Sequence, residues 1–196
     1  MFVLKGMYMV WLIVVEWLSR AIFLILVGLS VWSVSIIIER KRFFKNLSLP
    51  KESVKKSIKN KDFSFQENHF FTDLLKEISK LKSSEQIDKA FQSLVMDKKK
   101  ELEKGLPILG TLGSTTPFIG LLGTILGIIV SFGELSQGSG STNSVMFSLA
   151  EALILTAVGL IVAIPAVVAF NYFGRKMRLA LVEASSLKDL YIAYKD

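Results

Sequence analysis

The fold of this chain is decided by residues 106–173, which read LPILGTLGSTTPFIGLLGTILGIIVSFGELSQGSGSTNSVMFSLAEALILTAVGLIVAIPAVVAFNYF. This stretch holds two apolar runs, 106–133 and 148–173, joined by a short connection of glycine, serine and other polar residues. About 20 apolar residues in a helix span the ~30 Å hydrocarbon layer of a bilayer. The two runs therefore predict two transmembrane helices, with residues 134–147 as the loop between them.

The composition is that of an integral membrane protein. Hydrophobic residues make up 51% of the 196 residues and the mean hydropathy is +0.47, which is too apolar for an ordinary soluble domain. The net charge of +7 would suggest nucleic acid as a partner of a soluble chain, but membrane topology explains these basic residues more simply. We therefore expect membrane lipids, and no nucleic acid, among the partners. The sequence has no cysteine, which excludes a disulfide framework and a thiolate metal site.

A first span is predicted at residues 21–38, an uncharged stretch that is just long enough to cross a bilayer. A basic cluster follows it, and the positive-inside rule places such clusters in the cytoplasm. The loop 134–147 has no lysine or arginine, whereas the tail 174–196 is again basic. The N-terminus is thus expected outside and the C-terminus in the cytoplasm. The basic residues are Arg40, Lys41, Arg42 and Lys45 after the first span, and Arg175, Lys176 and Arg178 after the third.

The N-terminal residues 1–20 are largely apolar, with Lys5 near the start and the charged pair Glu16 and Arg20 near the end. These two residues are spaced i, i+4, so on a helix they are neighbours and can form an ion pair. Trp11 and Trp17 are the residue type that favours the headgroup level of a membrane. We expect a helix that lies in the membrane interface on the outer side.

Residues 39–105 are predicted to be a helical insertion on the cytoplasmic side. Apolar residues recur at helical spacing in two separate segments of it, and Ser83 with Gln86 has the form of a capping box at the start of the second. The two sets are Phe71, Leu74, Leu75, Ile78 and Leu81, and then Ile87, Ala90, Phe91, Leu94 and Val95. The apolar faces of these two helices must be covered, either by each other or by neighbouring subunits. No nucleophile, phosphate-binding loop or metal-ligand spacing occurs, and the lone His69 is given no metal role, so we expect neither an enzyme nor a cofactor.

Small residues follow one another along one face of each of the two later spans, at steps of three and four residues. Such faces let helix backbones approach closely in a membrane. We expect them to be helix-packing positions, and Pro165 additionally predicts a bend. The expected packing residues are Gly110, Gly113, Pro117, Gly120 and Gly127 in the second span, and Gly159, Ala163 and Pro165 in the third.

Three polar residues in these spans are candidates for an ion pathway. Counted from the outer ends at 1.5 Å per residue, Thr124 and Thr156 lie roughly 10 and 12 Å deep, so antiparallel helices would bring their hydroxyls to one level. Glu151 is an acidic residue inside a span, which commonly marks ion handling. It also lies near the helix start, where it would favour the helix dipole without any transport role. A membrane threonine, likewise, often only bonds the carbonyl one turn back.

At these residues the sequence resembles a known family. The string Gly113-Ser114-Thr115-Thr116-Pro117-Phe118-Ile119-Gly120-Leu121-Leu122-Gly123-Thr124-Ile125-Leu126-Gly127-Ile128, and later Ala150-Glu151-Ala152-Leu153-Ile154-Leu155-Thr156-Ala157-Val158-Gly159-Leu160 with Ala163-Ile164-Pro165-Ala166-Val167-Val168, is similar to the ExbB/TolQ family. The resemblance is strong over the last two spans and weak over the first. In the insertion it is limited to the kind of segment and its position in the chain.

The resemblance implies an all-α protein of the bacterial inner membrane, with its N-terminus in the periplasm, three transmembrane helices and long helices that extend into the cytoplasm. It implies a ring of five subunits around a dimer of an ExbD/TolR-type partner, whose single spanning helices occupy the pore. Such a complex uses the proton motive force to drive motion that reaches the outer membrane, in some cases through a TonB- or TolA-like protein. Thr124 and Thr156 match the pore threonines of the family and Glu151 matches its intramembrane glutamate.

Two alternatives to this function remain open at the level of sequence. The first is a motility stator of the MotA or gliding type, which could be driven by sodium. The second is a passive membrane scaffold, in which Glu151 and the two threonines only contribute to packing. The outer-membrane process that an energy-transducing complex would serve, import or a Tol-Pal type process, is not specified by these residues.

Overall fold

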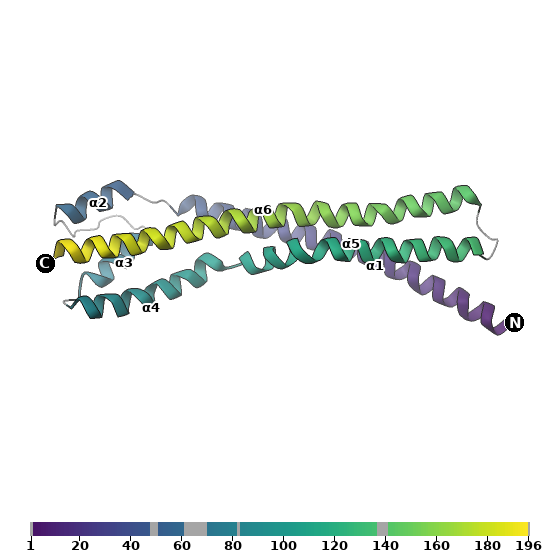
Figure 1. Cartoon of the computed structure of the whole chain (residues 1–196), viewed down its shortest axis with the longest axis horizontal. Coiled ribbons are helices and arrows are strands. Elements are labelled where there is room, and N and C mark those ends of the chain that lie inside the picture. Colours follow the sequence, from purple (N-terminus) through teal and green to yellow (C-terminus); the bar gives the residue numbers. More distant parts are fainter. Residues whose placement is uncertain (1, 48–50, 61–69, 82, 137–140, 196) are drawn as a thin grey trace. The chain divides into compact units, whose positions relative to one another are not determined.

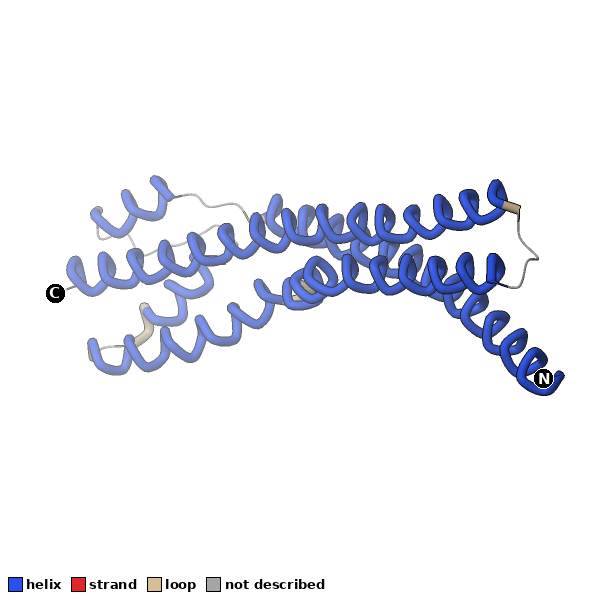
Figure 2. The backbone as a smooth tube through the Cα atoms, turned by 45° about the vertical axis from the view of Figure 1, so that its right-hand side comes forward, coloured by secondary structure: helices blue, strands red, loops and turns tan. Residues whose placement is uncertain are grey.

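The structure is a computed structural model, and it describes residues 2–47, 51–60, 70–81, 83–136 and 141–195. Within these ranges all regular secondary structure is α-helical (Figures 1 and 2). The helices are α1 (Phe2–Asn46), α2 (Lys51–Lys59), α3 (Phe70–Ile78), α4 (Ser84–Glu103), α5 (Leu106–Ser136) and α6 (Thr142–Lys195). The predicted all-α fold is confirmed.

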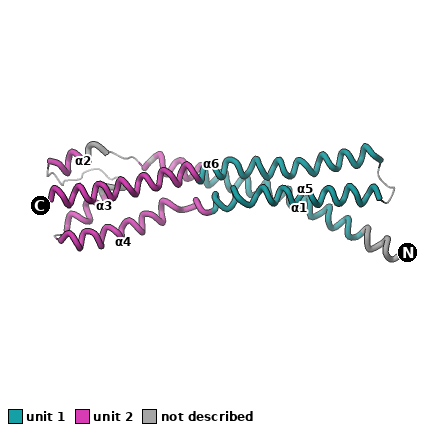
Figure 3. The backbone as a smooth tube through the Cα atoms, viewed as in Figure 1, with its two compact units in different colours: residues 1–37, 108–170 teal, residues 38–107, 171–196 magenta. Residues whose placement is uncertain are grey.

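The chain divides into two compact units, which Figure 3 colours separately. Unit 1 comprises Met1–Ile37 and Ile108–Phe170, and unit 2 comprises Ile38–Pro107 and Asn171–Asp196. Helices α1 and α6 contribute to both units. The boundaries between the units lie within three residues of the end of the first predicted span, the start of the second and the end of the third.

Unit 1 consists of the apolar parts of α1, α5 and α6. Helices α5 and α6 run antiparallel, because residues late in α5 contact residues early in α6: Gly127 meets Ala152, whereas Gly110 meets Phe170. Helix α1 packs on α5 through Leu12 and Ile22, which lie against Gly133 and Gly123. Many large apolar side chains of this unit remain exposed, as expected for helices that face lipid.

Three helices, α1, α5 and α6, are long and apolar enough to cross a membrane, which confirms the number of predicted spans. The helices are longer than the predicted spans, because helical structure continues where the chain becomes polar. The N-terminal segment and the first span form one uninterrupted helix, Phe2–Asn46, and α6 begins at Thr142, inside the predicted loop. The remainder of that loop, residues 137–140, lies outside the described residues, as does His69. The membrane level of each segment and its interfacial role remain predictions.

Unit 2 has a hydrophobic core of the kind found in water-soluble helix bundles. Its buried side chains come from α2, α3, α4 and the last part of α6, so the amphipathic faces predicted in the insertion pack on one another and on the C-terminal helix. They are Val54, Ile58, Leu74, Leu75, Ile78, Ile87, Phe91, Ala180, Ala184, Leu187 and Tyr191. Ser83 is the N-cap residue of α4, as predicted, but its side chain makes no capping hydrogen bond, so that part of the capping-box prediction is wrong.

An arginine of the predicted basic cluster holds the end of α4. Arg40 is buried, and it donates hydrogen bonds to the carbonyl oxygen of Glu101 at 3.0 Å and to the carboxylate of Glu39 at 2.8 Å. Its guanidinium lies 4.8 Å from the centre of the Phe43 ring. Helix α4 stops just beyond this point, and Gly105 has a φ of 76°, a conformation that favours glycine. Arg40 therefore stabilises the end of α4, in addition to the part in membrane orientation expected from the positive-inside rule.

Candidate functional site

The two candidate threonines lie against each other across the contact between α5 and α6. The Thr124 hydroxyl is hydrogen-bonded to the Thr156 hydroxyl, and it also lies 3.1 Å from the carbonyl oxygen of Ala152. A hydroxyl has one proton to donate, so Thr124 can donate to the Ala152 carbonyl while it accepts from Thr156. The expected pairing at one level is confirmed. Thr124 is buried, whereas Thr156 is half-buried.

The close approach of α5 and α6 at this level depends on glycine. A Cβ atom built on Gly120 would lie 2.7 Å from the carbonyl oxygen of Leu155, and one built on Gly159 would lie 2.7 Å from the carbonyl oxygen of Thr116. These neighbours are backbone atoms, so they cannot move aside without moving a helix. On one side of this crossing Gly127 faces Ala152, and on the other Gly113 faces Val167. The glycines thus bring the helices near enough for the two hydroxyls to meet.

The other predicted packing residues differ in their surroundings. Ala163 is buried in unit 1 and Gly110 lies against the Phe170 ring. Pro117 is half-buried, and Pro165 is exposed within this chain. The packing role and the bend assigned to Pro165 therefore stay predictions.

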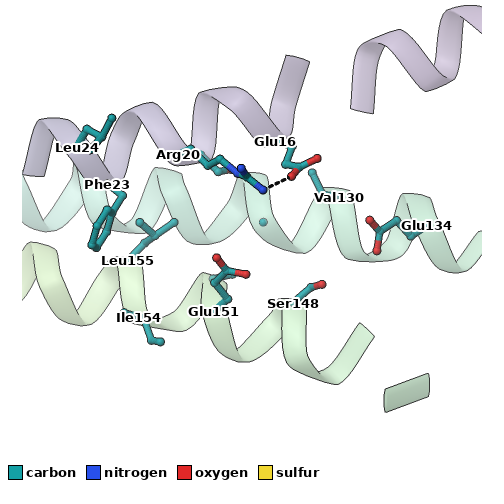
Figure 4. A pocket seen from close by; sticks show the side chains of 13 residues that line it. Glu16, Arg20, Phe23, Leu24, Val130, Glu134, Ser148, Glu151, Ile154 and Leu155 are labelled. Atoms are coloured by element: carbon teal, nitrogen blue, oxygen red, sulfur yellow. Dashed lines mark hydrogen bonds and ion pairs between the residues drawn. The ribbon is translucent and has the colours of Figure 1, made fainter. Parts of the chain in front are cut away.

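Glu151 lines a pocket of about 520 Å³ in unit 1, and neither Thr124 nor Thr156 is among the residues that line it. The pocket, called here the Glu151 pocket, lies among α1, α5 and α6 (Figure 4). A five-residue separation on a helix is a turn plus about 140°, which explains why Glu151 and Thr156 face different surroundings. The lining residues are Glu16, Ser19, Arg20, Phe23, Leu24, Gly127, Val130, Glu134, Ser148, Glu151, Ala152, Ile154 and Leu155.

Three carboxylates and one guanidinium meet at this pocket. Arg20 donates a hydrogen bond to Glu16 at 2.7 Å, which confirms the ion pair predicted from their spacing, and Glu134 and Glu151 line the same cavity. With all four groups ionised, the formal charge of the set is negative. The arrangement suits attraction of a cation toward Glu151, since a low-dielectric wall on one side strengthens such an interaction.

The sequence patterns single out Glu16, Arg20 and Glu151 without bringing them together, and they do not single out Glu134. The available signal concerned two of them, because Glu134 and Glu151 lie on either side of the predicted loop between the second and third spans, whereas Glu16 and Arg20 lie well inside α1, which begins at Phe2. A single sequence does not specify which faces of three helices converge. The structure shows which faces of α1, α5 and α6 converge at the pocket.

Comparisons with known proteins agree on one family. The family described as "MotA/TolQ/ExbB proton channel family" matches residues 64–185, more than half of the chain. The biopolymer transport protein ExbB of Xanthomonas campestris pv. campestris is 45% identical over 98 residues, which cover 48% of this chain and 38% of that relative.

Two further relatives give similar results. The Tol-Pal system protein TolQ of Pseudomonas aeruginosa is 34% identical over 151 residues, which cover 72% of this chain and 65% of the relative. The ExbB protein of Aquifex aeolicus is 46% identical over 85 residues, covering 43% of this chain and 57% of the relative. In each case the match spans less than two thirds of the relative's length.

Proposed function

The chain belongs to the MotA/TolQ/ExbB proton channel family, and on this basis we propose that it is the ring-forming subunit of an inner-membrane complex driven by the proton motive force. Its three apolar helices and its relatives make it a multi-pass inner-membrane protein. The proposed complex contains five copies of the chain around a dimer of an ExbD/TolR-type protein with one spanning helix per subunit. Its work is the transmission of energy to the outer membrane, through a TonB- or TolA-like protein.

The observation that carries this proposal is the hydroxyl pair of Thr124 and Thr156, which joins α5 to α6 in unit 1. Two hydroxyls at one depth form a polar spot without fixed charge, where each oxygen can donate and accept a hydrogen bond. Thr124 can retain the Ala152 carbonyl as its partner when Thr156 turns away. Thr156 is then available to water or to a carboxylate of the partner helix.

Glu151 has a separate part in the proposed mechanism. It lies in a pocket together with Glu16, Arg20 and Glu134, at the end where α5 stops and α6 begins. We propose that its charge stabilises a hydrated path on that side of the membrane and that the threonine pair acts deeper. In the orientation expected from the basic residues, this is the periplasmic side.

The exposed apolar surface of unit 1 supports an assembly with other membrane helices. Many large apolar side chains of this unit are exposed although others, such as Leu26 and Leu109, are buried, and such exposed surface is covered by lipid or by further helices. The carboxylate that carries the ion would belong to the partner, while this chain supplies the surrounding wall. No second function is favoured by a specific observation.

The proposal can be tested with the full chain and its single-span partner in liposomes, under an imposed pH gradient and membrane potential. We expect proton flux that requires both proteins and falls about tenfold or more in Glu151→Ala, because a positioned side chain that takes part in proton transfer contributes at least that much to the rate. Native mass should show the complex intact. A passive scaffold would give the reverse: unchanged flux, or loss of assembly together with flux. Replacing protons by sodium ions in the same assay tests the motility-stator alternative.

A further inference from the structure

We propose that Glu39 and Arg40 form a latch that holds the junction between α4 and α5 closed, and that this latch opens during the working cycle while the core of unit 2 stays folded. The contacts of the latch, called here the Arg40 latch, all lie within unit 2 and involve Glu39, Arg40, Glu101 and Lys104. Only its part in the working cycle rests on the proposed function.

The junction between α4 and α5 is a short interruption of helical structure. Helix α4 ends at Glu103 and α5 begins at Leu106, so only Lys104 and Gly105 lie between them. Gly105 has a φ of 76°, and glycine adopts positive and negative φ about equally readily, so this backbone does not fix the angle of the junction by itself. Helices α1 and α6, by contrast, continue without interruption from one unit into the other. The junction is thus a point at which the chain can bend.

Two neighbouring residues of α1 hold this junction. Arg40 donates a hydrogen bond of 3.0 Å to the carbonyl oxygen of Glu101, which is one of the last four carbonyls of α4 and therefore has no intrahelical partner. The Glu39 carboxylate lies 2.8 Å from the Arg40 guanidinium and 3.9 Å from the ammonium of Lys104, the C-cap residue of α4. The last turn of α4 and the residue that precedes Gly105 are therefore both fastened to α1.

The burial of Arg40 makes the latch a balanced contact. Its side chain is only 4% exposed, and its buried Nε has no hydrogen-bond partner among the described residues. Removal of a guanidinium from water costs several kcal/mol, which the bonds to Glu39 and Glu101 offset, and the unpaired donor adds to this cost. When the latch opens, water can satisfy all five donors of the guanidinium. The open state is therefore close enough in free energy to be populated.

The opening can be local, because the latch is separate from the core of unit 2. Leu102 lies between the two residues of α4 that the latch holds and is fully buried, but it does not belong to the buried cluster that forms the core. Ile87, near the start of the same helix, does belong to that cluster and is 1% exposed. Loss of contacts at the end of α4 would expose Leu102 and leave Ile87 covered. The two residues thus report on the latch and on the core.

The test is thiol labelling of the full chain in detergent micelles. The sequence has no cysteine, so Leu102→Cys and Ile87→Cys each introduce a single thiol. A buried thiol reacts with a maleimide when the structure around it opens, so the two labelling rates compare two opening equilibria. We expect Leu102→Cys to react about tenfold faster than Ile87→Cys, or more. Equal rates would show that the junction opens only together with the core, and they would overturn the proposal.

Two variants assign this opening to the latch. Arg40→Met removes the hydrogen bonds of the latch and keeps much of the apolar volume, so it should speed labelling of Leu102→Cys about tenfold or more and leave that of Ile87→Cys unchanged. Its control, Arg42→Met, replaces an exposed arginine of α1 and should change neither rate. Glu39→Gln keeps Arg40 and should speed labelling of Leu102→Cys by a smaller factor, and it decides the matter if Arg40→Met does not fold.

Two results with these variants would overturn the proposal. The first is an unchanged labelling rate of Leu102→Cys in both Arg40→Met and Glu39→Gln, which would show that these residues do not control the opening. The second is equal acceleration of Leu102→Cys and Ile87→Cys in Arg40→Met, which would assign Arg40 to the global stability of unit 2.

The part of the latch in the working cycle is tested by closing it covalently. Glu39→Cys and Lys104→Cys together can be joined by a short bifunctional methanethiosulfonate, whose disulfides a reductant cleaves, because the ends of the two native side chains lie 3.9 Å apart. In liposomes that carry the complex with its single-span partner, we expect proton flux to be lost on cross-linking and to return on reduction. The double variant before cross-linking is the control.

The flux measurement separates the latch from the proposed function. Unchanged flux in the cross-linked complex would overturn the part of the latch in the working cycle. Absence of flux in the wild-type complex would contradict the proposed function and that part with it. The labelling rates would then still decide whether the latch opens while the core stays folded.

Discussion

The two units of this chain use helices in opposite ways. In unit 2 the large apolar side chains are inside, as with Ile78 and Leu75, and the lysines are outside. In unit 1 many large apolar side chains are exposed, as with Leu24 and Ile161, while glycine, alanine and threonine fill the contact between α5 and α6. Both units are helical and both bury some large apolar side chains, such as Leu26 in unit 1; they differ in the large side chains that unit 1 exposes and in the glycine contacts between α5 and α6.

This difference indicates which surroundings, water or lipid, suit each unit. In water, burial of large apolar side chains supplies most of the stability. In lipid there is no such driving force between helices, so close backbone packing and hydrogen bonds between helices replace it. Each prediction below breaks one of these arrangements and leaves the other intact.

The largest effect is expected from closing the backbone contact in unit 1. In Gly120→Ala the new Cβ would lie 2.7 Å from the carbonyl oxygen of Leu155 and 3.1 Å from the Cα of Thr156. Since both neighbours are backbone, α5 and α6 must separate, and we expect a loss of about 3 kcal/mol or more, at the upper end of overpacking effects. The free energy of unfolding in mixed detergent micelles measures it.

The matched control is Gly174→Ala, on α6, where nothing lies within 4 Å of the added Cβ. Alanine there gains helix propensity of up to about 1 kcal/mol, so the variant should be as stable as the wild type or slightly more so. If Gly120→Ala were equally harmless, the account of unit 1 as a backbone-packed contact would be wrong.

A second, somewhat smaller effect is expected from truncation in the core of unit 2. Ile78 is fully buried, so Ile78→Ala should cost about 2–4 kcal/mol of the free energy of unfolding. Leu24→Ala removes a similar volume from a side chain of unit 1 that is 70% exposed, and in detergent we expect a change within about 0.5 kcal/mol. A comparable loss in Leu24→Ala would contradict the account, because it would mean that this exposed side chain contributes as much stability as a buried one.

The smallest effect concerns an ion pair in unit 2, outside the predicted spans. Lys188 donates to Asp88 at 2.6 Å, and this hydrogen bond holds the pKa of Lys188 above its ordinary value of 10.5. The pair links α6 to α4, and Lys188→Met should cost about 1 kcal/mol after solvent screening. Thermal unfolding of wild type and variant should differ at neutral pH.

The sign of the pH dependence follows from the raised pKa. The contribution of Lys188 is fully present below the ordinary lysine pKa, and it is lost as the pH rises through the raised value. The difference between wild type and Lys188→Met should therefore persist up to about pH 10 and shrink above it. Lys89→Met breaks an exposed pair with Glu85 on α4 and should shift stability by less than about 0.5 kcal/mol at any pH.

The general architecture was predictable because the signals that set it are local. Apolar length predicts three spans, helical periodicity predicts α3 and α4, and the depth of Thr124 and Thr156 places their hydroxyls at one level. The spacing of Glu16 and Arg20 predicts their ion pair. Each of these depends on distances along one helix, or on two helices joined by a short connection.

The features that could not be predicted depend on how separate helices are rotated against one another. The Glu151 pocket needs side chains from α1, α5 and α6, and the burial of Arg40 depends on where α4 ends. The pair of Lys188 and Asp88 joins residues 100 positions apart in the sequence. The capping bond of Ser83 was predicted and is absent, since the motif specifies residue types but not the side-chain rotamer.

The central claim, that the threonine pair is part of an ion path, is tested most directly by proton flux through the complex with Thr156→Val. Valine has nearly the shape of threonine, and Thr124 keeps the Ala152 carbonyl as its partner, so helix packing should survive. We expect flux to fall about tenfold or more while the assembled mass is unchanged, and Thr156→Ser, which keeps the hydroxyl, to retain most of the flux. Normal flux in Thr156→Val with an intact complex would contradict the claim and leave the pair as a packing contact.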